Sequence, residues 1–167
     1  RSRRSDREFC SAPDRAVTDI VDAATRSRMM RGIRAKNTKP EMVVRRMLHT
    51  QGFRYCLHDR RLPGTPDIVL PRYRAAVFVS GCFWHGHDCR LFRLPATRPE
   101  FWKKKLERNQ LNDVKARDEL ESAGWRHATV WECALRGRDK NVVVETGRRL
   151  AEWIRSEKQA CSFRGNA

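Results

Sequence analysis

The sequence predicts a single α/β domain in which helices flank a small mixed β-sheet. Three observations indicate this fold class: a helix with clear boundary signals, several short apolar runs typical of strands, and two further helical segments around one more apolar run. The chain has 167 residues, of which 40% are hydrophobic, so it is long enough to bury one core. We expect the domain to span residues 18–158, between a basic disordered tail at 1–17 and a C-terminal tail at 159–167.

The first predicted helix covers residues 38–52. Thr38 is a candidate N-cap, Pro40 lies in the first turn, and Glu41 completes a capping box with Thr38. Gly52 marks the end of this helix.

Strands and helices follow along the rest of the chain. Four apolar segments are expected to be strands, of which the second turns directly into the third: 53–59, 67–74, 75–81 and 125–132. The long charged stretch 99–123 has no internal glycine or proline, and it predicts a helix that ends at Gly124. Residues 141–158 predict a closing helix.

The charge of the chain indicates its class of partner. Basic side chains outnumber acidic ones by 36 to 20, which gives a formal net charge of +16 and favours nucleic acid. A membrane surface is disfavoured, because no long apolar run, basic amphipathic helix with an aromatic face or lipidation signal stands out. The segment 26–39 has six basic residues and no acid. It is either a contact face that exposes Met29 and Met30 to the partner, or a solvated helix face.

The six cysteines bear on redox state and on metal binding. Because no signal peptide is seen, a disulfide framework is disfavoured and a reduced, cytosolic protein is expected. Cys10 and Cys161 lie in the expected tails and Cys56 lies in a predicted strand, so these three are interpreted as ordinary thiols.

The segment GCFWHGHDC at 81–89 combines thiols with imidazoles. Cys82 and Cys89 flank His87, and Cys133 follows a predicted strand that can run beside the strand preceding this segment. Three thiolates and one imidazole form a closed tetrahedral set, which suits a structural zinc ion. The alternative for Cys133 is a small apolar residue buried at a strand end.

Asp67 and His85 are candidates for chemistry. His85 is separated from His87 by one residue and need not reach the same ion, so it is either an inert loop residue or free to move protons. Asp67 opens an apolar strand behind a turn that contains glycine and proline. It either caps its own backbone or binds a hard cation such as magnesium, which would polarise a phosphate toward attack by water.

The proline-aspartate pair that opens this strand resembles the metal-binding signature of the PD-(D/E)xK nucleases, but the next strand, AVFVSG, lacks the acid and lysine of that pattern. Five segments together closely resemble the very short patch repair (Vsr) endonucleases: TRSRMMRGIRAKNTKPE, LPGTPDIVL, VFVSGCFWHGHDC, LFRLPATRPEFW and GWRHATVWECALRGR. The resemblance covers about residues 22–140 and implies a restriction-endonuclease-like fold with a structural zinc site.

The resemblance also implies roles for individual residues. Magnesium would be bound by Asp67 and by the backbone carbonyl of Val79, which accounts for the missing acid. His85 would be the general base, held by Asp113, and Glu41 would be a further catalytic residue. The zinc ligands would be the four residues already chosen for their chemistry.

The aromatic residues receive a role from the same resemblance. Phe83, Trp84 and Trp102 would wedge into the base stack from the major groove, and Met30 would enter from the minor groove. Flat apolar side chains can replace base stacking, and a mismatch makes the required opening less costly. The alternative for these aromatics is packing in the core.

Three positions depart from the family pattern. The family often has a run of histidines where this chain carries Ser80, Gly86 and Asp88. Because Ser80 would lie close to the scissile phosphate, a different reaction rate or metal preference is expected.

These features predict a magnesium-dependent endonuclease that nicks one strand 5′ of the thymine in a T:G mismatch and so initiates very short patch repair of deaminated 5-methylcytosine. We expect a monomer of the bacterial cytoplasm, associated with the nucleoid, that acts on double-stranded DNA and has other mismatch-repair proteins as partners. Two alternatives are retained: a zinc-stabilised DNA-binding module without catalysis, and a restriction-type nuclease that cuts both strands. Asp67, His85 and Asp113 together argue against the first, and the wedge residues argue against the second.

Overall fold

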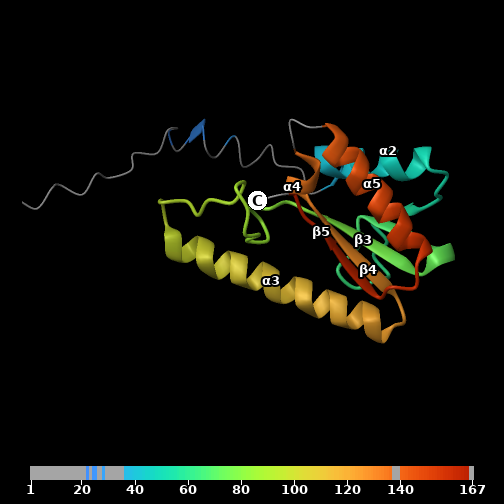
Figure 1. Ribbon diagram of the computed structural model, residues 1–167. Coiled ribbons are helices and arrows are strands. Elements are labelled where there is room, and N and C mark those ends of the chain that lie inside the picture. Colours follow the sequence, from blue (N-terminus) through green and yellow to red (C-terminus); the bar gives the residue numbers. More distant parts are fainter. Residues whose placement is uncertain (1–21, 23, 26–27, 29–35, 137–139, 166–167) are drawn as a thin grey trace, which may run out of the picture.

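The computed structural model describes residues 22, 24–25, 28, 36–136 and 140–165 (Figure 1). The basic tail expected at 1–17 and the wedge candidate Met30 lie outside the described residues. The described helices and strands are, in chain order, α2 (Lys39–Thr50), β1 (Cys56–Leu57), β2 (Ile68–Leu70), the 3-10 helix η1 (Pro71–Tyr73), β3 (Ala75–Ser80), α3 (Pro99–Ser122), β4 (Arg126–Trp131), α4 (Glu132–Leu135), α5 (Lys140–Arg155) and β5 (Ala160–Phe163).

The sheet is mixed, as the sequence predicted. Its five strands lie in the order β1-β2-β3-β4-β5. β2 is antiparallel to both β1 and β3, whereas β4 is parallel to both β3 and β5. Because β3 and β4 are parallel and Ser80 pairs with Trp131, the residues that follow these two strands emerge at the same edge of the sheet. Segment 81–89 and Cys133 therefore meet there.

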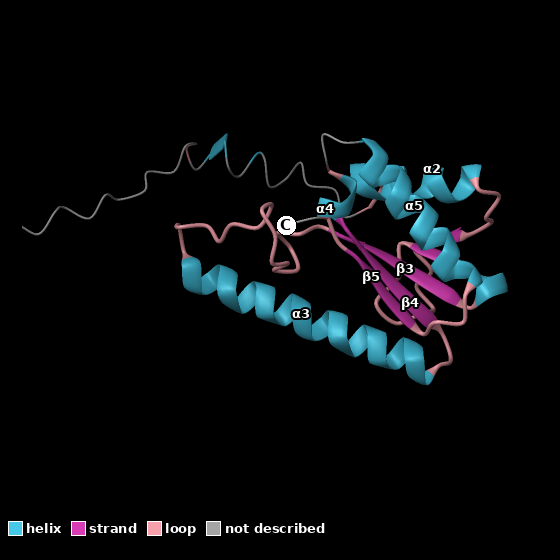
Figure 2. Ribbon diagram, viewed as in Figure 1, coloured by secondary structure: helices cyan, strands magenta, loops and turns pink. Residues whose placement is uncertain are grey.

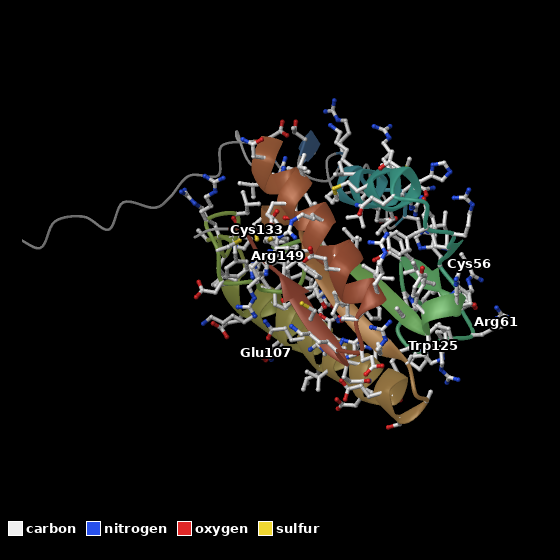
Figure 3. The ribbon with its side chains drawn as sticks, turned by 45° about the vertical axis from the view of Figure 1, so that its right-hand side comes forward. Cys56, Arg61, Glu107, Trp125, Cys133 and Arg149 are labelled. Atoms are coloured by element: carbon white, nitrogen blue, oxygen red, sulfur yellow. The ribbon has the colours of Figure 1, made fainter. Side chains whose placement is uncertain are left out.

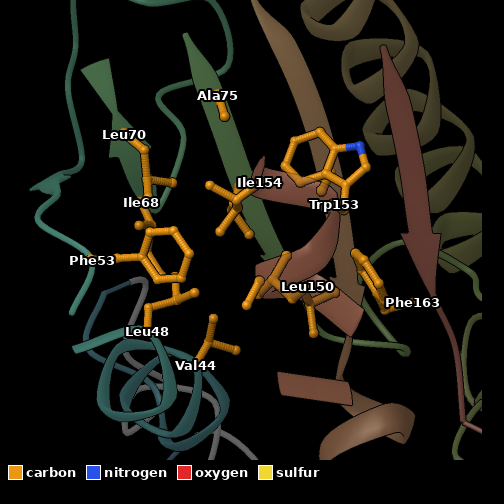
Figure 4. Packing of buried hydrophobic residues seen from close by; sticks show 14 residues of the cluster. Val44, Leu48, Phe53, Ile68, Leu70, Ala75, Leu150, Trp153, Ile154 and Phe163 are labelled. Carbon is orange, nitrogen blue, oxygen red and sulfur yellow. The ribbon is translucent and has the colours of Figure 1, made fainter. Parts of the chain in front are cut away.

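Helices cover both faces of the sheet. α2 and α5 lie on one side, and α3 runs along the other (Figures 1 and 2). All of β2 and the first half of β3 are buried, which is typical of strands enclosed on two faces. The main cluster of buried apolar side chains lies between α2, α5 and the sheet (Figure 4) and includes Val44, Leu48, Phe53, Ile68, Leu70, Leu150, Trp153 and Ile154. Among the described residues, no helix has the length and apolar sequence needed to cross a membrane.

Helix α2 begins with the predicted capping box. The Thr38 hydroxyl accepts a hydrogen bond from the Glu41 backbone N–H at 3.4 Å, and the Glu41 carboxylate accepts one from the Thr38 N–H at 3.3 Å. The helix ends at Thr50, and Gly52 follows with φ of +83°, a left-handed conformation that favours glycine. The cap fixes the position of Glu41, whose side chain points inward and is 2% exposed.

The strand expected at 53–59 is much shorter than predicted. The Phe53 N–H donates to the Leu48 carbonyl at 3.0 Å, so this residue is bonded to the last turn of α2 and not to a strand, and its ring packs in the core. His58 has φ of +49°, which is incompatible with an extended strand. Only Cys56–Leu57 pairs with β2.

The C-terminal segment 159–167, expected to be a tail, contains strand β5. This prediction was wrong because a short parallel edge strand takes its hydrogen bonds from its neighbour, here β4, and needs little apolar pattern of its own. Phe163 fixes the strand by packing into the core, where it is 2% exposed. Cys161 lies in this strand and packs against the same core, so it is not in a frayed end.

Candidate active site

A cavity of about 700 Å³ lies between the start of α2, the end of β3 and the middle of α3. Its walls include all five residues to which the sequence analysis assigned catalysis or magnesium binding: Glu41, Asp67, Val79, His85 and Asp113. Ser80 and Trp84 also line the cavity. The fold therefore brings together the polar residues that the resemblance grouped.

Asp67 lies directly before β2, and one of its two carboxylate oxygens has a backbone partner. Its Oδ2 accepts a hydrogen bond from the Val79 N–H at 2.7 Å. Burial, together with the nearby charge of Glu41, raises the pKa of Asp67 to about 6, although the hydrogen bond from Val79 acts in the opposite direction. A carboxylate with so little solvation gains from a cation beside it, which makes Asp67 a suitable ligand for a hard metal ion.

His85 is paired with Asp113 of α3. Its Nδ1 lies 2.5 Å from the Asp113 Oδ2, and the two side chains are 27% and 29% exposed. An ionised carboxylate only accepts hydrogen bonds, so Nδ1 carries the proton in this pair and Nε2 is left to accept another. The pair is therefore arranged as an imidazole base with an orienting acid.

Helix α3 also holds the backbone around His85. Asn109 donates to the Trp84 carbonyl at 2.7 Å, and Gln110 donates to the His85 carbonyl at 3.0 Å. Gly86, with φ of +58°, leaves room for Gln110, whose Nε2 would lie 2.6 Å from a Cβ at that position. The left-handed backbone at Gly86 favours glycine over a larger residue at this position.

Glu41 reaches the cavity but is strongly engaged in the protein. Its carboxylate accepts hydrogen bonds from the backbone N–H groups of Asn37 and Thr38 and from the Arg45 guanidinium, the last at 2.8 Å. The Arg45 and Glu41 side chains are only 8% and 3% exposed. The resemblance named Glu41 as catalytic, and the geometry adds a structural task at the start of α2.

His58 is a residue of this site that the sequence analysis missed. Its Nδ1 lies 3.7 Å from Asp67 Oδ1, its Nε2 lies 3.6 Å from Glu41 Oε2, and burial lowers its pKa. Glu41, His58 and Asp67 together offer three ligand atoms within 4.8 Å of one another. Only the register of the antiparallel pair β1–β2 could have identified His58. Extending the pair Leu57↔Ile68 by one residue sets His58 opposite Asp67.

The predicted zinc ligands also form a cluster. Ligand atoms of Cys82, His87, Cys89 and Cys133 all lie within 4.8 Å of one another, and the thiols are not in disulfides. Cys56 is exposed and lies at the far end of the sheet from Cys133, so it is not part of this group (Figure 3).

The residues of this cluster fit a bound cation. His87 is 6% exposed, its Nε2 is buried without a hydrogen-bond partner, and its Nδ1 lies 3.6 Å from the Cys133 sulfur. Burial raises the pKa of the Cys82 thiol, so thiolates gathered here need a positive partner. Trp131 stacks on the His87 ring with centroids 4.1 Å apart and an interplanar angle of 15°, which fixes the ring.

The three wedge candidates of the described chain pack against each other beside the cavity. The Phe83 ring centroid lies 5.1 Å from that of Trp84 and 5.2 Å from that of Trp102. Each of the three is partly buried, which is intermediate between an exposed wedge and a core residue. The Lys105 ammonium lies 5.6 Å from the Trp84 ring and 5.8 Å from the Trp102 ring, so the cluster combines stacking surface with positive charge.

Comparison with known proteins identifies the family of this chain. Residues 18–91 match the family described as DNA mismatch endonuclease Vsr. The chain is 45% identical over 141 residues to the DNA mismatch endonuclease Vsr of Escherichia coli strain K12, across 84% of this chain and 90% of that protein. The chain belongs to the Vsr family.

Two type II nicking enzymes are also similar to this Vsr family member. One, from Xanthomonas oryzae pv. oryzae, is 47% identical over 119 residues, which cover 71% of this chain and 88% of that enzyme. Another, from Neisseria meningitidis serogroup A, is 44% identical over 139 residues, which cover 83% and 98% of the two chains. The family resemblance inferred from five short segments is therefore confirmed over most of the chain.

Proposed function

We propose that this Vsr family member is a magnesium-dependent DNA endonuclease that nicks one strand 5′ of the thymine in a T:G mismatch and initiates very short patch repair of deaminated 5-methylcytosine. The observation that carries the proposal is the position of the Asp67 carboxylate and the His85–Asp113 pair in one cavity. The relatives support it, since one is named as a DNA mismatch endonuclease and two as nicking enzymes. The relationship of the fold to the restriction endonucleases stays a prediction.

Each polar residue of the cavity has a task in this proposal. Asp67 and the Val79 carbonyl would hold magnesium, which when bound neutralises charge on the scissile phosphate. His85 takes the proton of the attacking water on Nε2, because Asp113 accepts the hydrogen of Nδ1 and stabilises the imidazolium that forms. Glu41 adds negative charge at the cavity wall beside Asp67. The products would carry a 5′-phosphate and a 3′-hydroxyl.

Structural zinc would be bound by the second cluster, which consists of Cys82, His87, Cys89 and Cys133. Four protein ligands leave no open position for water, so this ion would take no part in hydrolysis. Its task would be to join the loop that carries His85 to Cys133 in helix α4, which directly follows β4.

The aromatic cluster would read the lesion. Phe83, Trp84 and Trp102 would enter the base stack from the major groove, and Met30, outside the described residues, from the minor groove. The net charge of +16 would supply phosphate contacts of low sequence preference. We further propose that the protein acts as a monomer at the bacterial nucleoid, with other mismatch-repair proteins as partners.

Labelled duplexes test the proposed function. The protein is incubated with magnesium and duplexes that contain either a T:G or a T:A pair, with each strand labelled separately. We expect a single nick 5′ of the mismatched thymine and an intact opposite strand. Binding without any cut would favour a silent DNA-binding module, and cuts in both strands of the paired duplex would favour a restriction-type nuclease.

Replacing Asp113 by asparagine should slow nicking by about 10²–10⁴-fold, because the amide no longer stabilises the protonated His85 or selects its Nδ1–H form. Mismatch binding should change little. The measurement is the single-turnover rate over a range of pH. Asp118→Asn, at an exposed position on the same helix, is the matched control. A rate for Asp113→Asn equal to that of the control would remove Asp113 from the mechanism.

The Trp84→Ala, Trp102→Ala double variant should lose most of its preference for mismatched over paired duplex. Unstacking a base step costs a few kcal/mol on paired DNA and less at a mismatch, so the preference depends on the inserted rings. The salt dependence of binding should stay nearly unchanged, because it reports phosphate contacts. Titrations of both duplexes over a salt series give the two quantities.

Trp125→Phe is the control for this double variant, because Trp125 follows the C-terminal end of α3 (Figure 3), whereas Trp102 lies in the first turn of that helix. Preference that survives the double replacement would assign mismatch recognition to hydrogen bonds with base edges. A collapse of the salt slope would show that the tryptophans support the fold instead.

A further inference from the structure

His58 lies between a buried arginine and the carboxylate assigned to magnesium. Arg45 Nη2 lies 2.9 Å from His58 Nε2, and His58 Nδ1 lies 3.7 Å from Asp67 Oδ1. The Arg45 and His58 side chains are 8% and 13% exposed. Nε2 also lies 3.6 Å from Glu41 Oε2, beyond hydrogen-bond distance, and that oxygen accepts a hydrogen bond from the same Arg45 Nη2. The nearest partner of Nε2 is therefore the Arg45 cation, and the nearest charged group to Nδ1 is the Asp67 carboxylate.

Arg45 determines which nitrogen of His58 carries the proton. A guanidinium has five N–H donors and no acceptor, so the nitrogen that meets it must accept. Nε2 is therefore unprotonated, and in the neutral ring the proton lies on Nδ1, which faces Asp67. A nitrogen that carries a proton has no lone pair for a metal ion, so His58 does not act as a third ligand beside Glu41 and Asp67, although its distance would permit it.

The position of Arg45 is itself fixed by α2. Arg45 is four residues after Glu41 on the helix and donates to the Glu41 carboxylate at 2.8 Å and to the Asn37 side-chain oxygen at 2.6 Å. Glu41 in turn completes the N-terminal cap. The helix start, the arginine and the histidine form one continuous chain of contacts that leads to Asp67.

We propose that His58, in the tautomer set by Arg45, is a positioning residue that orients the Asp67 carboxylate for the catalytic cation. This inference rests on the proposed function, because it assigns a task to His58 toward the Asp67 metal site. The Val79 N–H donates to Oδ2 at 2.7 Å, and the His58 Nδ1 faces Oδ1 at 3.7 Å, beyond a hydrogen bond but close enough for electrostatic attraction to favour one orientation of the carboxylate. Each oxygen keeps a lone pair for the cation.

The first experiment reads the tautomer in the wild-type protein. Long-range ¹H–¹⁵N NMR of histidine-labelled protein without added magnesium separates a protonated from an unprotonated ring nitrogen, and the spectrum of His58→Gln assigns the signals. We expect His58 with the proton on Nδ1 at pH 8. A proton on Nε2 would overturn the proposal. This measurement does not depend on nicking, so its failure is distinct from failure of the proposed function.

The second experiment compares two substitutions of the same residue. In His58→Asn the amide nitrogen can occupy the place of Nδ1 and donate toward Asp67, whereas in His58→Gln the longer amide reaches toward Arg45. Mn²⁺ binding is followed by electron paramagnetic resonance, and single-turnover nicking is measured on the T:G duplex. We expect His58→Gln to weaken Mn²⁺ binding and to slow nicking by about tenfold each, because the N–H that faces Asp67 Oδ1 at 3.7 Å is removed.

His58→Asn should retain both properties within about threefold of wild type. His49→Gln, at an exposed position on α2, should equal the wild type and controls for removal of a histidine. Equal loss of Mn²⁺ binding in both His58 variants would mean that the ring nitrogen is a metal ligand. No loss in either would mean that His58 does not position Asp67. Both results would overturn the proposal, and thermal unfolding of each variant verifies that it is folded.

Discussion

Asp67→Asn should abolish nicking and at the same time stabilise the folded protein at pH 7 in buffer without magnesium. Nicking is lost because the amide is a poor ligand for a hard cation, and the cation supplies several kcal/mol of transition-state stabilisation. At about 1.4 kcal/mol for each tenfold change in rate, the expected loss is about a thousandfold or more. Mismatch binding should be retained, since a negative charge near the phosphate is removed.

The gain in stability follows from the raised pKa of Asp67. Its ordinary value is 3.8 and its value in the folded protein is about 6, so between these pH values the folded state binds more protons than the unfolded state. Stability therefore falls as the pH rises from about 4 to 6, and above pH 6 the ionised carboxylate leaves the folded state less stable by roughly 2–3 kcal/mol. Asparagine removes this charge and can still accept the hydrogen bond from Val79.

Urea unfolding at pH 5 and pH 7.5 measures this effect. The difference between Asp67→Asn and wild type should be larger at the higher pH. Asp59→Asn supplies a contrast of opposite sign, because hydrogen bonds from Arg61 lower the pKa of Asp59 to about 2 and its ionised form is favoured by folding. Nicking by Asp67→Asn at the wild-type rate would remove Asp67 from the metal site. A stability difference that does not vary with pH would mean that its carboxylate is well solvated.

Local sequence signals were sufficient for the elements that carry the cavity. The start of α2 follows from the reciprocal bonds of Thr38 and Glu41, which involve residues three apart and need no tertiary contact. The apolar runs that became β3 and β4 and the uninterrupted helix α3 are also local features. Strand β5 was missed because its pairing partner lies far away in sequence, and because only Phe163 of its four residues is buried.

The same distinction applies to the site residues. Thiols and imidazoles in one short segment predict metal binding whatever the fold, and the parallel pairing of β3 with β4 then brings Cys133 to them. His58 and Arg45 carry no such signal, because a histidine after a short strand and an arginine within a helix are common. Their importance arises only from the register that sets His58 opposite Asp67 and from the burial of Arg45.

Cys133→Ser should release zinc and lower the free energy of unfolding by more than about 4 kcal/mol, the range found when a structural metal is lost. Serine keeps the size of the residue but not the thiolate that zinc prefers. Cys133 is 8% exposed, and its sulfur also accepts a hydrogen bond from the Gly165 N–H at 3.3 Å. The variant should also nick more slowly, because the cluster fixes both ends of the loop that carries His85.

Cys161→Ser is the matched control, since Cys161 lies in β5, is partly buried and is not in the cluster. Elemental analysis should find about one zinc ion per chain in wild type and in this control, and much less in Cys133→Ser. A strong chelator should reduce wild-type stability to that of Cys133→Ser and change that variant little, because the ion is bound to the folded state alone. Absence of zinc from the wild-type protein, together with equal stability of the two serine variants, would mean that the three thiols and the imidazole do not bind a structural ion.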